Sequence, residues 1–216
     1  MSGTATKKKM DRLVLMMIPI GVAVNFIGGQ IAILLRLPVY LDSIGTIVVA
    51  ALCGWWPGLI VGVISNVLNS ISSPIYIWYA SLSALFAIVA AFFSKKKVFI
   101  SFPKTLLSAL AFAFIGGGLG ACLTWTLFGF DFGTTTSVIF AIPLHNMGLP
   151  KFLAQFIAEF GMDCFDKVVT VIAVFGVLKA MPVRFLTKLP LGDIYIKDAD
   201  KAAEDEDDDD DKETKK

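Results

Sequence analysis

Long stretches of this chain carry no charge, and they constrain the fold more than any other feature. Residues 43–94 form one such stretch, and residues 13–35 and 105–130 form two more. Apolar residues make up 56 % of the chain, whereas ordinary soluble domains are about 45–50 % apolar. We therefore expect an all-α membrane protein of one domain, because apolar runs of about 20 residues are long enough to cross a bilayer as helices.

The apolar runs predict six membrane-spanning helices, at 13–35, 41–56, 57–72, 75–94, 104–128 and 151–181. The second and third have only 16 residues each, which is roughly 24 Å of helix, and we expect their outer ends to stop inside a protein-lined cavity. These two short central helices should form a hairpin that turns at Trp55-Trp56-Pro57-Gly58, because proline suits the first position of a helix.

One face of the third predicted helix carries small and amide side chains, at Gly58, Gly62, Asn66, Asn69 and Ser73. Glycines at this spacing allow a neighbouring helix to approach closely. The amides of Asn66 and Asn69 have two interpretations: they bind the polar edges of a ligand, or they form hydrogen bonds between helices.

The distribution of basic residues sets the expected orientation and divides the chain. Lysine and arginine gather at the N-terminus, at 95–104 and at 179–188, whereas only Arg36 and Lys151 fall on the other side. The positive-inside rule then places both termini in the cytoplasm. We expect four parts: a cytoplasmic basic N-terminus at 1–12, the six-helix domain at 13–181, a basic cytoplasmic exit at 182–197 and an acidic tail at 198–216. The tail holds 11 acidic and 4 basic residues, and such self-repulsion predicts disorder.

The last predicted helix has an unusual polar face. Gln155, Glu159, Asp163, Asp166 and Thr170 follow at steps of four, four, three and four, and Lys167 lies one turn after Asp163. A charge at membrane depth costs about 2.5–3.5 kcal/mol, so these groups should face a cavity, a ligand or one another. Either they form a binding site, or Asp163 and Lys167 form an internal salt bridge while Glu159 and Asp166 are exposed at an end. Adjacent residues do not share a helical face, so we expect Asp166 and Lys167 not to pair across one face and at least one carboxylate to need another partner.

Further candidate binding residues lie in the predicted outer loops and helix ends. Trp78, Tyr79 and Trp125 could stack on a flat ligand or belong to an interfacial aromatic belt. Arg36 and Tyr40 flank the first outer loop, where Arg36 has either a ligand anion or Asp42 as its partner. His145, with Asn146 beside it, is the chain's single histidine and does not by itself indicate a metal site.

The sequence carries no motif of nucleotide hydrolysis and no catalytic triad signature. Cys53, Cys122 and Cys164 lie in apolar runs without CxxC spacing, so we interpret them as small apolar fillers. We therefore expect a binding protein that is not an enzyme, with no cofactor, no metal and no nucleic-acid partner. Its energy would come from a partner or from an ion gradient.

Several motifs resemble one family of membrane proteins. They are LPVYLDSIGTI at Leu37–Ile47, GWWPGLIVG at Gly54–Gly62, NxxN at Asn66–Asn69 and DKxxT at Asp166–Thr170. Together with six predicted helices and both ends inside, they make residues 12–181 similar to the substrate-binding S-components of energy-coupling-factor (ECF) transporters.

The resemblance implies a high-affinity binder of a vitamin or other micronutrient in the bacterial plasma membrane. Such proteins join a transducer membrane subunit and two ATPases. The implied site residues are Arg36, Tyr40, Asn69, Trp78, Tyr79, Trp125, His145, Asn146, Glu159 and Asp163. Transducer coupling in this family uses small residues of the first helix, here Pro19-x-x-x-Ala23 and Gly21-x-x-x-Asn25.

Two other functions agree with the same residues. One is a membrane module that senses a ligand and signals to a cytoplasmic partner. The other is a stand-alone carrier coupled to ions or protons through Glu159, Asp163 and Asp166, although no internal repeat supports it. If the chain captures a substrate, the long loop 130–150 is a candidate lid over the binding site.

Overall fold

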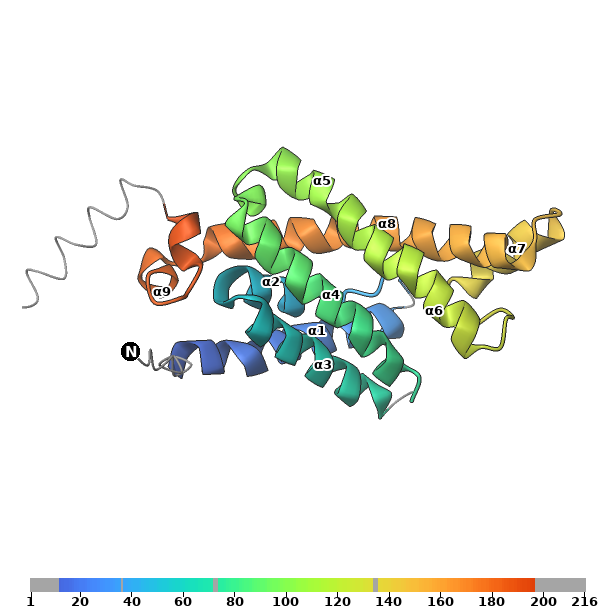
Figure 1. Cartoon of the computed structure of the whole chain (residues 1–216), viewed down its shortest axis with the longest axis horizontal. Helices are drawn as coiled ribbons and strands as arrows, with labels where there is room; N and C mark the ends of the chain where they lie inside the picture. Colours follow the sequence, from blue (N-terminus) through green and yellow to red (C-terminus); the bar gives the residue numbers. More distant parts are fainter. Residues whose placement is uncertain (1–11, 36, 72–73, 134–135, 197–216) are drawn as a thin grey trace, which may run out of the picture.

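The computed structural model describes residues 12–35, 37–71, 74–133 and 136–196, and in these ranges it contains helices and no strand. The elements are α1 (Arg12–Leu34), α2 (Ile44–Cys53), α3 (Trp55–Ser70), α4 (Tyr76–Lys95), η1 (Val98–Ile100), α5 (Phe102–Ala113), η2 (Phe114–Leu119), α6 (Gly120–Leu127), α7 (Val138–Asn146), α8 (Lys151–Ala180), α9 (Val183–Leu186) and η3 (Gly192–Tyr195). Figure 1 shows α8 running along the molecule, and α2, α5, α6 and α7 pack on it. The all-α prediction is confirmed for these residues. Arg36, Ser73, the first 11 residues and the acidic tail lie outside them.

Three segments of the described chain are long and apolar enough to cross a membrane. They are Arg12–Ala32 in α1, Tyr76–Lys95 in α4 and the continuous segment Phe102–Leu127. Large apolar side chains are exposed along them, for example Ile20 and Leu107. Exposed apolar surface of this extent suits contact with lipid, so the structure agrees with a membrane protein.

The predicted central hairpin is present, but its turn lies earlier than expected. α2 ends at Cys53 and α3 begins at Trp55, so Gly54 alone forms the turn. Its φ of 96° lies in the region that only glycine adopts without strain. Pro57 lies inside the first turn of α3, where its missing N–H costs no intrahelical hydrogen bond. The prediction that the helix breaks at Trp56-Pro57 was therefore wrong.

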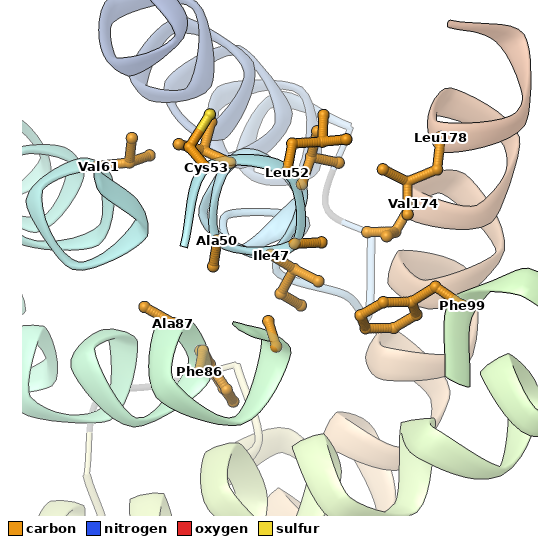
Figure 2. Close-up of a cluster of buried hydrophobic side chains, with 14 of the residues drawn as sticks. Ile47, Ala50, Leu52, Cys53, Val61, Phe86, Ala87, Phe99, Val174 and Leu178 are labelled. Carbon is orange, nitrogen blue, oxygen red and sulfur yellow. The ribbon is translucent and has the colours of Figure 1, made fainter. Parts of the chain in front are cut away.

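α2 forms the centre of the core, with every residue except Ile44 buried. Figure 2 shows its side chains, among them Ile47 and Leu52, facing side chains of α4 and α8 such as Phe86 and Val174. With 10 residues, or roughly 15 Å, α2 is shorter than the 16-residue helix predicted. Its first turn is replaced by the loop before Ile44, which the functional site below explains.

The contact between α1 and the hairpin depends on Gly21 and Asn25. A Cβ atom on Gly45 would collide with the Gly21 carbonyl, so glycine permits the crossing of α1 and α2. The Asn25 amide donates to Thr46 Oγ1 at 2.8 Å and to Ser65 Oγ at 3.1 Å, and its oxygen accepts from the Gly45 N–H at 2.7 Å. Asn25 therefore ties three helices together from a fully buried position.

These contacts correct part of the predicted coupling face. Gly21 and Asn25 face inward and are not available to a partner helix, whereas Pro19 and Ala23 are exposed. The two pairs are offset by two residues, or about 200° around a helix, so they lie on opposite faces.

The predicted fifth helix is one continuous rod with a π-helical segment in its middle, at η2. The following stretch, 130–150, is not a plain loop: it contains α7. The sequence predicted a loop here, whereas the structure has a helix that includes Pro143 and packs on α8.

The chain after α8 turns back onto the end of the bundle. The Leu191 N–H donates to the Leu52 carbonyl at 2.9 Å, and the Tyr195 hydroxyl lies 2.7 Å from Ser94 Oγ. Leu186 and Leu189 are buried there. The predicted basic exit is thus a docked segment that closes one end of the core.

Candidate functional site

The polar face predicted for the last helix is confirmed. The five residues at steps of three and four are all buried on α8: Gln155, Glu159, Asp163, Asp166 and Thr170. α8 continues through them for 30 residues without an internal proline. Because α8 packs against α2, α5, α6 and α7, this face lies inside the bundle, and Glu159 and Asp166 are not exposed at an end.

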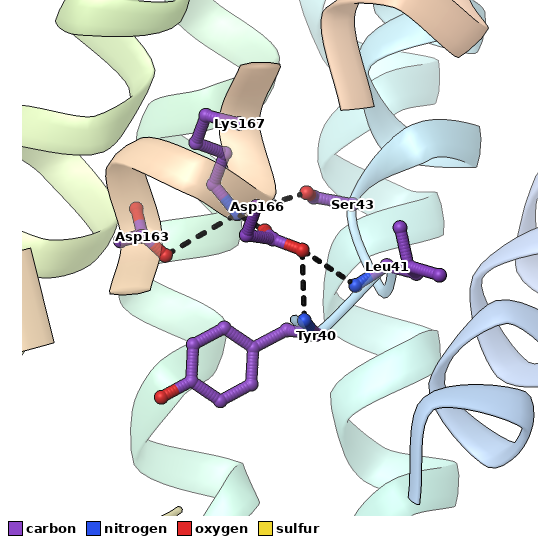
Figure 3. Close-up of polar contacts among 6 residues, drawn as sticks. All are labelled: Tyr40, Leu41, Ser43, Asp163, Asp166 and Lys167. Carbon is purple, nitrogen blue, oxygen red and sulfur yellow. Dashed lines mark hydrogen bonds and ion pairs between the residues drawn. The ribbon is translucent and has the colours of Figure 1, made fainter. Parts of the chain in front are cut away.

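Lys167 lies at the centre of this face with 2 % of its surface exposed. Its ammonium donates to Asp166 Oδ2 at 2.6 Å, lies 3.5 Å from Asp163 Oδ1 and donates to Ser43 Oγ at 3.3 Å. Figure 3 shows these contacts. The pairing of Asp166 with Lys167 contradicts the prediction from adjacency, because the flexible four-carbon stem of lysine lets its ammonium fold back onto the preceding residue.

Asp166 also fixes the loop before α2. Its Oδ1 accepts hydrogen bonds from the backbone N–H groups of Tyr40 at 2.7 Å and Leu41 at 2.9 Å (Figure 3). Leu41 has a φ of 53°, which brings two successive N–H groups toward one acceptor. These bonds replace the helical turn that the sequence predicted at 41–43, and they place Tyr40 beside α8.

A second polar group lies nearer the start of α8. The Gln155 amide donates to Glu159 Oε1 at 2.6 Å and to Ser137 Oγ at 3.2 Å, and Ser137 lies 3.3 Å from the same carboxylate oxygen. Ser137 immediately precedes α7 and is fully buried. The stretch predicted as a lid therefore contacts the polar face through this serine.

Three polar atoms of this face have no hydrogen-bond partner among the described residues: Gln155 Oε1, Asp163 Oδ2 and Thr170 Oγ1. A buried polar atom without a partner costs about 1–3 kcal/mol, and one α8 face carries all three. Buried polar atoms without partners require an explanation, and a ligand that contacts them would supply one.

Glycines of the π-helical segment let α8 approach this closely. A Cβ on Gly116 would collide with the Asp163 carboxylate, and one on Gly117 would lie 2.6 Å from the Phe160 Cα. The absence of a Cβ at both positions therefore lets the two helices pack closely. The sequence did not indicate that Asp163 lies opposite them.

Aromatic side chains border the carboxylates. The Tyr79 hydroxyl bonds to Thr124 Oγ1 at 2.7 Å, and the Tyr76 and Tyr79 rings lie 6.4 Å apart. Tyr40 and Tyr79 both lie within electrostatic range of Glu159. Trp125 packs on Phe152 at 5.4 Å, so it lines the same end of α8.

Other predicted site residues lie elsewhere. Asn66 donates to the Gly62 carbonyl at 2.8 Å and to Ser83 Oγ at 2.7 Å, so it links α3 to α4 as the helix-packing interpretation expected. Asn69 is buried on the same face of α3. Trp78 is 58 % exposed, which agrees better with an aromatic belt than with ligand stacking.

His145 and Asn146, which the sequence placed in an outer loop, make no hydrogen bond or ion pair with the polar face among the described residues. Asn146 is exposed, and His145 Nδ1 lies 2.7 Å from the Leu149 carbonyl within its own turn. Arg36 lies outside the described residues.

Two residues that the sequence analysis did not select join the site. Ser43 contacts Lys167, and Ser137 contacts Gln155 and Glu159. Ser43 falls in the predicted helix 41–56, whose first turn is a loop in the structure, and Ser137 falls in the predicted loop 130–150, so no helical periodicity marked either serine as part of the site. Asp42, predicted only as a partner of Arg36, lies within electrostatic range of Lys167 and Asp166.

In the described ranges, no three histidine, cysteine or acidic side chains converge as a metal site would require. No family model, curated protein or solved structure matches the chain. Any functional conclusion therefore depends on the geometry of the molecule, which has a buried, acceptor-rich face inside a bundle of apolar helices.

Proposed function

We propose that this chain is the substrate-capture subunit of an ECF-type importer in a bacterial plasma membrane, and that it binds a vitamin or other micronutrient. The observation that carries the proposal is the α8 face with three buried polar atoms that have no partner among the described residues, which are Gln155 Oε1, Asp163 Oδ2 and Thr170 Oγ1. A ligand with complementary groups would recover the free energy that these atoms lose on burial.

The surroundings of the face support binding of a small molecule. Asp166 holds the loop at Tyr40 and Leu41 against α8, and Ser137 brings the α7 segment to the same face. Two connecting segments thus border the acceptors, as loops that close over a ligand do. The contact between Asp166 and the loop at Tyr40 and Leu41 joins two motifs, Leu37–Ile47 and Asp166–Thr170, that resemble those of S-components.

The proposal includes six spans with both termini in the cytoplasm. The α6–α8 connection would then face outward and the α4–α5 connection inward. In a background lacking Cys53, Cys122 and Cys164, a membrane-impermeant maleimide added to intact cells should label Asn146→Cys and not Lys96→Cys. Labelling of Lys96→Cys and not of Asn146→Cys would indicate the opposite orientation.

The partners in this proposal are a transducer subunit and two ATPases. The exposed face of α1 offers a surface for the transducer, with Pro19 and Ala23 among apolar side chains such as Met16, Ile20 and Ile27. Small side chains let two helices meet closely in a membrane. We assign coupling to this face in place of the pair Gly21 and Asn25.

The first test is native mass spectrometry of the purified protein, which should detect a bound nutrient-sized molecule. That molecule is then offered to vesicles containing this chain with and without the transducer and the ATPases. Uptake should require ATP and all partners. A protein that carries no small molecule and is not stabilised by any member of a nutrient panel would contradict the proposal, because a ligand at a hundredfold excess over Kd stabilises by about 2.7 kcal/mol.

A second candidate function is a stand-alone ion-coupled carrier. The observation that favours it is the buried charge cluster of Asp163, Asp166 and Lys167, since such clusters relay protons or ions in many carriers. Uptake into vesicles without ATPases, driven by a proton or sodium gradient, would select this function over the first.

A further inference from the structure

A groove lies between the start of α3 and the end of α4, two helices that pack against each other. Its volume is about 260 Å³, and it is lined by Trp55, Ile88, Ala91, Phe92 and Lys95. The four residues from α4 follow at steps of three, one and three, so they share one face of that helix. None of the lining residues belongs to the polar face of α8.

The lining of the groove is apolar except at one end. Ala91 is 4 % exposed and forms the floor, whereas Ile88 and Phe92 on either side of it are large and exposed. Trp55 borders the groove from α3, and its ring stacks on Trp56 with the centroids 4.4 Å apart. A small side chain between larger ones leaves a channel on the helix surface, and its apolar walls suit a hydrocarbon chain.

Lysines gather at the end of the groove. Lys95 lines it, and the Lys96 ammonium lies 5.7 Å from the centre of the Phe92 ring, which lines it as well. Lys95, Lys96 and Lys97 are exposed, and no ion pair within the described part of the chain involves them. The positive charge at this end of the groove is therefore available to an anion.

The order of these groups along α4 matches the order of groups in a phospholipid. Tyr76–Lys95 is long and apolar enough to cross a membrane, so Lys95 lies where that segment ends. Ile88 lies seven residues earlier, or about 10 Å along the helix axis. The lysines are thus at the depth of lipid headgroups, where tryptophan is also common, and Ile88 is at the depth of the acyl chains.

We propose that this groove binds an anionic phospholipid, with an acyl chain along Ala91 and the phosphate held by Lys95 and Lys96. A zwitterionic lipid would bring its own cation close to these lysines, so charge complementarity selects the anionic headgroup. The inference requires that α4 crosses the membrane, and it does not depend on substrate capture. In the orientation proposed above, the groove opens to the inner leaflet.

Native mass spectrometry of the full-length protein in detergent tests this site by titration with phosphatidylglycerol or with phosphatidylcholine of the same acyl chains. Phosphatidylglycerol should bind at least about fivefold more tightly, and added salt should reduce the difference. Equal affinities would overturn the proposal. Phosphatidylglycerol binding that appears only after deletion of residues 198–216 would also overturn it, because the acidic tail would then be the occupant of the groove.

Two variants and one control locate the binding. Lys95→Gln should lower the affinity for phosphatidylglycerol about fivefold and leave that for phosphatidylcholine unchanged. Ala91→Leu fills the floor of the groove and should weaken binding of both lipids. Lys104→Gln removes an exposed lysine that does not line the groove and should bind both lipids as the parent does.

The melting temperature without lipid separates misfolding from lost affinity in these variants. Equal losses in Lys95→Gln and Lys104→Gln would mean that the lipid is attracted to the basic surface as a whole, and they would overturn the site. Unchanged affinity for both lipids in a folded Ala91→Leu protein would overturn the placement of the acyl chain.

Discussion

Lys167 neutralises part of the negative charge that α8 brings into the bundle, so its loss should be costly. In Lys167→Met, Asp163 and Asp166 would remain buried without their cation, and we expect a loss of about 3–5 kcal/mol of stability. Reversible unfolding of the protein in detergent measures it. Lys151→Met, at an exposed lysine, is the matched control.

The double variant Asp166→Asn with Lys167→Met separates charge from shape. The asparagine oxygen can still accept from the Tyr40 and Leu41 N–H groups, and no unpaired charge remains at that position. We expect the double variant to lose less unfolding free energy than the sum of the losses of the two single variants, by about 0.5–3 kcal/mol. Strict additivity would mean that Asp166 and Lys167 do not act as a pair.

Asp131 offers a pH-dependent contact at the surface. The Lys151 ammonium donates to its Oδ1 at 3.0 Å and lowers the pKa of the Asp131 carboxyl below its ordinary value. A carboxyl whose pKa is lowered in the folded state stabilises the protein at pH values above the pKa of the unfolded state. This stabilisation is lost as the pH falls through the pKa of the folded state. The contact should therefore persist at pH 5 and break only at a pH below the ordinary Asp pKa of about 3.9. NMR titration of the carboxyl should show the pKa rising in Lys151→Met and staying unchanged in Lys188→Met.

The buried face of α8 was predictable from residue spacing alone, because a helical period fixes which side chains share a face. The partners of that face were not. Ser43 and Ser137 reach it from connecting segments, whose positions depend on tertiary contacts such as the Asp166 bonds to the Tyr40 loop. Pairing of Asp166 with Lys167 was missed because the spacing rule ignores side-chain flexibility.

At the scale of elements, the glycines of η2 set how closely α8 packs. A Cβ on Gly117 would lie 2.6 Å from the Phe160 Cα, which is backbone and cannot move aside as a side-chain tip would. We expect Gly117→Ala to cost about 1–3 kcal/mol through overpacking. Thermal unfolding in detergent checks this.

Gly120→Ala supplies the comparison. Its added Cβ would meet Leu82 Cδ1 at 3.5 Å, an ordinary contact, so the helix propensity of alanine should make this variant neutral or up to about 1 kcal/mol more stable. Equal effects at both positions would show that helix propensity, and not the approach of α8, decides the outcome.

The hairpin illustrates what sequence can and cannot fix in an element. Apolar content and the Trp-Trp-Pro-Gly run predicted two short helices folded on each other, as found. The turn was placed too late because proline is a stronger signal than a single glycine, although proline is compatible with the first turn of α3 and Gly54 alone adopts a positive φ there.

For the whole molecule, the sequence predicted the class better than the arrangement. Charge-free runs are enough to indicate apolar helices, and three of the described segments have the length to cross a membrane. The central position of α2, enclosed by α1, α3, α4 and α8, follows from packing between distant segments. No local pattern distinguishes a fully enclosed apolar helix from one that contacts lipid.

Deletions from the end of the chain test whether the segment after α8 stabilises the core on which it packs. Deleting residues 198–216 removes a charged stretch beyond the described helices and should leave stability and ligand binding unchanged. Deleting 183–216 also removes Leu186 and Leu189, which are buried, and the Leu191 bond to Leu52, so it should cost about 3 kcal/mol or more. Melting temperatures of both variants, with and without ligand, give the comparison. Loss of ligand binding on deletion of 198–216 would show that the tail contributes to the site. Unchanged stability on deletion of 183–216 would show that the core does not need α9 and η3.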